Sequence, residues 1–181
     1  MKTLFSLLLA ILASLPALVQ AAETQVIVRQ EGMLLRVEGW LTTTVDVNTA
    51  WGVLTDYTRF PDFVPGIRRN LVVESNGNTK LINQQGELAV GNLRMPYEGT
   101  MRIEEVPGEG LDILFLSGLF KDVRGEWQVG RGRPLKLIYR MKMDLMKTII
   151  PAPLVSPMAE AQVRLWVTVF AQEMERRHGN R

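Results

Sequence analysis

The stretch "VNTAWGVLTDYTRFPDFVPGIRR" (residues 47–69) decides the fold, because it combines a helix, a stop signal and a cluster of rigid aromatic residues. Its first half repeats apolar residues at helical spacing behind Asp46, a suitable N-cap, so we expect a short helix to about Tyr57. Pro61 and Pro65 break that helix and predict a second short turn or helix. The stretch therefore predicts two short helical elements joined by a rigid, aromatic-rich junction.

Strand and turn patterns on both sides of this stretch predict an antiparallel sheet. Two β-rich segments before it, separated by Glu31 and Gly32, predict a hairpin that ends near residue 45. After it, Asn76 and Gly77 form the strongest short hairpin signal in the chain. Apolar and polar residues alternate most clearly over residues 93–104 and 135–145, as they do in half-buried strands. We expect about six strands in this part of the chain.

A long helix is predicted at the C-terminal end. Ser156 is a suitable N-cap, Pro157 suits the first helical position, and a broad apolar face continues to about Arg177. One apolar sheet face and one long helix to cover it define an α+β arrangement. Ligand cavities form in such interfaces between a curved sheet and its helix.

The first residues have the pattern of a secretory signal peptide. Lys2 precedes an apolar run at residues 4–19, and a small-residue site ends at Ala21. We therefore expect residues 1–21 to be a signal peptide and residues 22–181 to be a single domain. The mature protein is expected to be exported, with the periplasm as its destination, and to keep no stable membrane anchor after cleavage.

Composition excludes several functional classes. The chain has no cysteine, which excludes disulfides and thiolate metal sites. Removal of Lys2 leaves 20 Lys and Arg against 19 Asp and Glu, with no basic stripe of the kind that nucleic-acid partners require. Neither a carboxylate-rich loop nor a phosphate-binding motif appears, so we expect no metal and no cofactor.

Two motifs resemble those of a known superfamily. Residues 47–69 resemble the "VW.VLTDY..FP.FVP" block of the SRPBCC superfamily, also called START-like or helix-grip, and "SGLFKDVRGEW" (residues 117–127) resembles its "G.FK...G.W" block. The resemblance extends over roughly residues 33–177 and is greatest to the polyketide cyclase/dehydrase and coenzyme Q-binding-protein-like branch. It implies a helix-grip fold, in which a curved antiparallel sheet of about seven strands wraps around a long C-terminal helix, with two short helices after the first strand.

The resemblance also implies an internal cavity for apolar ligands. From strand parity and helical spacing we expect the aromatic and Met side chains on the inward faces to line it, with the aromatic residues of the junction forming a rim that faces the C-terminal helix. The competing interpretation is that these side chains fill a solid core and pack the loop. The predicted lining residues are Tyr57, Phe60, Phe63, Met95, Tyr97, Met101, Phe115, Phe120, Trp127, Tyr139, Met141, Met143, Trp166 and Phe170.

Little in the sequence points to catalysis. The single histidine, His178, lies in an Arg-rich tail and is expected to be a solvated residue at a helix end. No serine lies in a G-x-S-x-G elbow. Tyr97, Tyr139 and Glu87 remain as acid–base candidates, although buried groups of these types are usually hydrogen-bonded parts of the structure.

Two functions therefore stay open, and the sequence favours the first. The first is an exported binding or carrier protein for a hydrophobic small molecule, such as a lipid or an isoprenoid quinone. The second is a cyclase or aromatase-type enzyme that acts on a polyketide-like substrate in the same cavity; export and the missing pocket histidine argue against it. A protein-interaction module that exposes the junction aromatics is a weaker third interpretation.

Overall fold

The computed structural model describes residues 24–90, 93–148 and 150–180. The predicted signal peptide, residues 1–21, lies outside the described residues. All elements discussed below belong to the described part of the chain.

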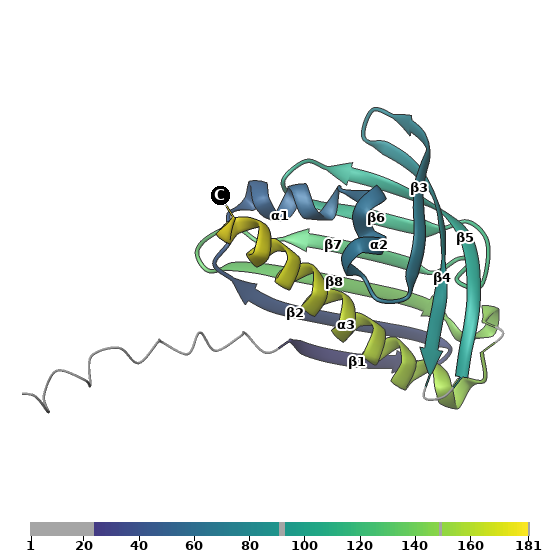
Figure 1. Ribbon diagram of the computed structural model, residues 1–181. Helices are drawn as coiled ribbons and strands as arrows, with labels where there is room; N and C mark the ends of the chain where they lie inside the picture. Colours follow the sequence, from purple (N-terminus) through teal and green to yellow (C-terminus); the bar gives the residue numbers. More distant parts are fainter. Residues whose placement is uncertain (1–23, 91–92, 149, 181) are drawn as a thin grey trace, which may run out of the picture.

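The described residues form one antiparallel sheet of eight strands in the order β1-β2-β8-β7-β6-β5-β4-β3. Figure 1 shows that the sheet curls, because β3, β4 and β5 run nearly upright in the view where β1, β2, β8 and β7 run nearly across it. The strands are β1 (Gln25–Glu31), β2 (Leu34–Thr43), β3 (Ile67–Asn76), β4 (Thr79–Val90), β5 (Leu93–Val106), β6 (Gly110–Phe115), β7 (Arg124–Val129) and β8 (Leu135–Asp144).

The helices of the described chain lie on one face of this sheet, and the long helix crosses it diagonally (Figure 1). Asp46 caps α1 by accepting a 2.9 Å hydrogen bond from the backbone N–H of Thr49, as its position before the apolar repeat predicts. The helices are α1 (Val47–Leu54), α2 (Phe60–Phe63) and α3 (Ala152–Gly179), with 3₁₀ turns η1 (Tyr57–Arg59) and η2 (Leu145–Lys147).

This architecture is the α+β helix-grip fold that the resemblance implies. The N-terminal hairpin and six later strands, expected from the turn signals, are present as β1–β2 and β3–β8. The resemblance alone implied about seven strands; the structure has eight, and two of them, β1 and β2, precede the short helices. For the same reason the two short helices follow the second strand instead of the first.

The start of the long helix differs from the prediction. Helix α3 begins at Ala152, with Pro151 as N-cap, so Ser156 is not its cap and Pro157 lies inside it. A proline in a helix removes one backbone hydrogen bond. Val155, which is buried, lies in the additional turn, and burial of this side chain offsets that loss.

Strand β8 provides the clearest inner face. Its alternate side chains from Leu135 to Met143 are all buried, whereas Lys136 and Lys142 between them are exposed. Val163, Val167 and Phe170 of α3 are buried in the same core cluster as this face. The alternation in the sequence therefore marks the side of the sheet that α3 covers.

Gly39 allows α3 to approach the sheet closely. It lies on β2 between Val26 of β1 and Tyr139 of β8. A Cβ at this position would lie only 2.6 Å from Cγ1 of Val163 and 3.3 Å from Cγ2 of Val167. The helix thus rests on a strand position where only a hydrogen atom fits.

A charged cluster fixes the other end of α3. Glu173 is buried and accepts hydrogen bonds of 2.7 Å from Arg176 and from Arg177, and Arg177 donates a further 2.8 Å bond to Asp56 after α1. The hydrogen bonds from Arg176 are the main reason that the pKa of Glu173 is lowered to about 2. The cluster ties the C-terminal turn of α3 to the junction that follows α1.

The Gly39 contact can be tested with two alanine substitutions. We expect Gly39→Ala to lower the free energy of unfolding by about 1–3 kcal/mol, because the added methyl group overpacks against Val163. Val163→Ala should relieve that clash, so the double variant is expected to lose less stability than the sum of the two single losses. Chemical denaturation measures all four proteins. If the two single losses add up to that of the double variant, the contact is contradicted. Gly52→Ala, on the exposed surface of α1, is the control, and it should raise the free energy of unfolding by at most about 1 kcal/mol.

The Glu173 cluster predicts a defined pH dependence. Because the pKa of Glu173 is lower in the folded than in the unfolded chain, its contribution to stability is complete above about pH 4.5 and is lost as pH falls toward 2. We expect Glu173→Gln to lower the free energy of unfolding at pH 7 by about 2 kcal/mol, and the gap to wild type to close on acidification. Glu160→Gln, which removes an exposed pair with Arg164, is the matched control. A gap that is independent of pH would contradict the prediction.

Candidate functional site

The space between the sheet and α3 contains two separate voids of about 40 Å³ each. The first, called here the loop void, lies next to Val123, Ile150 and the start of α3. The second, called the junction void, lies next to η1, α2 and the first residues of β3. Ligand pockets for small molecules usually measure about 300–1,000 Å³, so side chains fill most of the interior that the resemblance implies to be hollow.

Three aromatic side chains form the partition between the two voids. Phe115, Tyr139 and Trp166 line both of them. Tyr139 and Trp166 meet edge to face with ring centroids 5.2 Å apart. Trp166 is only half-buried, whereas Phe115 and Tyr139 are buried.

Most of the predicted lining residues lie on the walls of these voids. The junction residues Tyr57 and Phe60 line the junction void, and the rings of Phe60 and Phe63 each pack on Phe170 at 5.1–5.2 Å. The predicted residues on one or both walls are Tyr57, Phe60, Met101, Phe115, Phe120, Trp127, Tyr139, Met141, Met143, Trp166 and Phe170. Their role as ligand contacts stays a prediction.

Three predicted residues are placed elsewhere. Phe63, Met95 and Tyr97 line neither void, and each of them is half-buried. Tyr97 packs edge-on against Phe120, 5.2 Å between centroids, so it stands behind the wall of the loop void. Tyr57 also differs from the prediction of a rim, because its side chain is buried in the core.

A chain of polar groups crosses the wall of the junction void. The hydroxyl of Tyr97 donates to Oε1 of Gln84 at 3.0 Å, and Nε2 of Gln84 donates to Oδ1 of Asn70 at 3.1 Å. Nδ2 of Asn70 then donates to the backbone oxygen of Tyr57 at 2.8 Å. Burial raises the pKa of Tyr97 to about 12, so this tyrosine stays protonated and donates at neutral pH.

The hydroxyl of Tyr57 is also occupied. It donates to Oε1 of Glu105 at 2.8 Å, and Lys80 lies 3.8 Å from the other carboxylate oxygen. Burial and this hydrogen bond both raise the pKa of Tyr57. The hydroxyl therefore holds the junction against β5 and does not act as a free acid or base.

Sequence reasoning missed the amide side chains of the junction void. Asn70 and Gln84 lie directly opposite each other on β3 and β4, and both are buried. An alternation of buried positions runs along β4 through Ile82, Gln84 and Leu88, and it places Gln84 on the inner face. That parity was the available signal, but polar residues in a strand are usually assigned to the solvent side.

Of the other acid–base candidates, Tyr139 lines both voids, whereas Glu87 lies away from them, as does the single histidine. Glu87 forms ion pairs with Arg68 at 2.7 Å and Arg94 at 3.8 Å. His178 lies 3.3 Å from Asp46 and is exposed at the end of α3.

Among the described residues, no group of three or more His, Cys, Asp or Glu side chains is placed to hold a metal ion. No helix in the described ranges has both the length and the apolar run that a membrane span needs.

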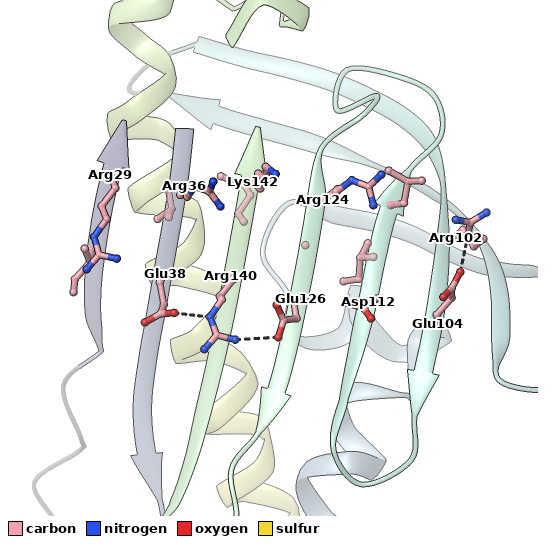
Figure 2. A pocket seen from close by; sticks show the side chains of 16 residues that line it. Arg29, Arg36, Glu38, Arg102, Glu104, Asp112, Arg124, Glu126, Arg140 and Lys142 are labelled. Atoms are coloured by element: carbon pink, nitrogen blue, oxygen red, sulfur yellow. Dashed lines mark hydrogen bonds and ion pairs between the residues drawn. The ribbon is translucent and has the colours of Figure 1, made fainter. Parts of the chain in front are cut away.

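A broad groove lies on the opposite, outer face of the sheet. This groove measures about 580 Å³. Figure 2 shows charged side chains of β1, β2, β8, β7, β6 and β5 arranged in two rows across it. Strand register places the basic row on adjacent strands, with Arg36 opposite both Arg29 and Lys142, and Lys142 opposite Arg124. The basic row is Arg29, Arg36, Lys142, Arg124 and Arg102, and the second row is Glu38, Arg140, Glu126, Asp112 and Glu104.

Ion pairs hold much of the second row together. Arg140 donates to Glu38 at 2.5 Å and to Glu126 at 2.9 Å, and Arg102 lies 3.2 Å from Glu104. All of these side chains are at least a third exposed, so their pairing contributes little to stability. The groove is therefore a solvated face on which charged side chains predominate.

The comparisons with known proteins agree with this geometry. The family described as polyketide cyclase/dehydrase and lipid transport matches residues 43–170, which is well over half of the 181 residues. The chain therefore belongs to this family. No curated protein matches the sequence.

Solved structures with the same fold include both carriers and enzymes by name. A STAR-related lipid transfer protein from Xanthomonas axonopodis is 12% identical, with a TM-score of 0.69 over 84% of this chain and 93% of that one. The Zhui aromatase/cyclase from Streptomyces sp. R1128 is 18% identical, with a TM-score of 0.63 over 80% and 95%. A START superfamily protein from Mycobacterium smegmatis is 13% identical, with a TM-score of 0.62 over 80% and 97%. At these identities the likeness shows the START-like fold alone.

The polar chain beside the junction void gives a direct prediction. Asn70→Ala leaves the backbone oxygen of Tyr57 and Nε2 of Gln84 without these hydrogen-bond partners. We therefore expect the free energy of unfolding to fall by about 2–4 kcal/mol. Asn83→Ala, one position along on the outer face, is the control and should change stability by less than about 0.5 kcal/mol. Urea denaturation compares the two. Equal losses of stability in the two variants would show that the buried hydrogen-bond chain contributes no more than an exposed hydrogen bond.

Proposed function

We propose that this protein binds and carries a hydrophobic small molecule between the sheet and α3. The observation that carries the proposal is the pair of neighbouring voids, which only one aromatic partition separates. Shielding an apolar molecule from water is favourable by about 25 cal/mol for each Å² of apolar surface buried. A protein that encloses such a molecule therefore allows it to cross an aqueous compartment.

The lining of the loop void supports this proposal. It is formed by aliphatic, aromatic and Met side chains, with Gln162 as the one amide among them. Met141, Met143 and Met158 contribute three flexible thioether chains, which can repack around ligands of different shape. Since the two voids are small, binding requires the partition and these Met side chains to move apart.

An enzyme of the cyclase type is less well supported. Such chemistry needs an acid or base in contact with the substrate. Tyr57 and Tyr97 have their hydroxyls bonded to Glu105 and Gln84, and Glu87 is paired outside the voids. Tyr139 lines both voids, but burial raises the pKa of its hydroxyl and makes it a weak acid. The geometry of the described residues thus supplies binding surface more readily than proton transfer.

Export completes the proposal, because the predicted signal peptide directs the chain to the periplasm, where a carrier moves apolar molecules through water. The intact mass of the protein recovered from a periplasmic fraction tests it. We expect the mass of residues 22–181. A protein that retains residues 1–21 or stays in the cytoplasm would overturn this part of the proposal.

Binding itself is tested by filling the loop void. Native mass spectrometry and organic extraction of the purified protein identify any bound apolar molecule, and N-phenyl-1-naphthylamine serves as a fluorescent apolar probe. Ala159 is buried on α3 and lines the loop void, so Ala159→Leu should occupy the space and weaken probe binding by about tenfold or more. Ala161→Leu, on the exposed side of the same helix, is the matched control. Equal binding by both variants would place the probe elsewhere and count against the carrier function.

A further inference from the structure

The hydroxyl group of Tyr139 belongs to the partition, and it has no hydrogen-bond partner among the described residues. Its ring lies in the middle of β8, packed at 4.7 Å on Trp127 and at 5.2 Å on Trp166. The whole side chain is 1% exposed. Buried hydroxyl groups nearly always have a partner, so this group needs an explanation.

Gly125 makes room for this hydroxyl. Gly125 lies on β7, two residues before the direct partner of Tyr139, which is Trp127. A Cβ at Gly125 would lie 2.6 Å from the hydroxyl oxygen and 3.3 Å from two ring carbons. A buried hydroxyl without a partner lowers the stability of the fold, and phenylalanine would fill the same site without one. The sequence nevertheless has tyrosine at this position and glycine beneath its hydroxyl.

The walls of the two voids also limit the charge of a ligand. No Asp, Glu, Lys, Arg or His lines either void in the described part of the chain. A buried charge without a partner is strongly unfavourable. A molecule that occupies this space must therefore be neutral where it contacts the partition.

We infer that Tyr139 anchors the ligand by donating a hydrogen bond, and that the ligand is a neutral apolar molecule with an acceptor oxygen, such as a ketone, quinone, ester or ether. This inference rests on the proposed function, because it needs a ligand between the two voids. Burial raises the pKa of Tyr139, so the hydroxyl stays protonated and acts as a donor. Free fatty acids and other anions are excluded from the partition by the absence of a matching cation on its walls.

The experiment uses three probes of one shape on the full mature protein. Fluorene is the hydrocarbon, fluorenone adds a carbonyl oxygen, and fluorene carboxylic acid adds a charge at neutral pH. We expect wild type to bind fluorenone more tightly than fluorene and to bind the carboxylate weakest. Tyr139→Phe should weaken fluorenone binding by about tenfold, the size of one net hydrogen bond, and leave fluorene binding unchanged. Isothermal titration calorimetry measures each affinity.

The stability of the unliganded variant separates an anchor from a structural hydroxyl. Tyr139→Phe should keep or raise the midpoint of thermal unfolding, because no protein partner of the hydroxyl is lost. Tyr97→Phe is the matched substitution and should lower the midpoint, since it leaves Gln84 without its donor. A lower midpoint in Tyr139→Phe would mean that a protein group or an ordered water already accepts this hydrogen bond, and would overturn the inference.

The outcomes distinguish the anchor from the carrier function. Fluorene and fluorenone that bind wild type, but lose affinity equally in Tyr139→Phe, would refute the anchor and leave the carrier function standing. Failure of wild type to bind either neutral probe would refute both. Gly125→Ala provides a second variant. Its added methyl group displaces the hydroxyl of Tyr139 from its position, although the side chain keeps its hydroxyl. It too should remove the preference for fluorenone over fluorene, and an unchanged preference would count against the anchor.

Discussion

The contact between α3 and β2 at Gly39 is the constraint on which the rest of the structure depends. Because the helix lies within van der Waals distance of the sheet backbone there, its distance from every other strand is set by the curl of the sheet. Near Gly39 no space remains between helix and sheet, and Val163 and Val167 are fully buried. Farther along, where β3, β4 and β5 turn away, large aromatic and Met side chains fill the widening gap. The two voids lie at the places where this filling is incomplete.

Most of the fold follows from local patterns in the sequence. The alternation along residues 135–145 marks the inner face of β8 correctly, and Asp46 begins α1 as its position predicts. Ser156 failed as a helix start because a local capping rule does not include burial of Val155, which lies in the preceding turn that begins at Ala152. The candidate site was less accessible to such rules. Strand parity shows which side chains face inward, but whether they leave a void depends on the distance between helix and sheet, which no local pattern encodes.

The three tyrosines show how that limit operates at single residues. Tyr57, Tyr97 and Tyr139 were all expected to line one cavity. In the structure Tyr57 is bonded to Glu105 and Tyr97 to Gln84, and these partners lie 48 and 13 residues away along the chain. Tyr139 has a ring environment as closely packed as theirs, but its hydroxyl faces a glycine. Only the tertiary arrangement distinguishes two structural hydroxyls from one that is available to a ligand.

The two faces of the sheet divide polar and apolar roles, and this division bears on function. On the outer face, Arg140 pairs with Glu38 and Glu126 in water, where each pair contributes little. On the inner face the unpaired hydroxyl of Tyr139 lies in a low-dielectric interior, where a hydrogen bond is stronger and an unpaired polar group is more costly. A ligand that brings an oxygen to this point gains that bond, whereas a hydrocarbon of the same shape gains only burial. Selectivity in such a site therefore comes from one polar group, and the apolar walls supply affinity without discrimination.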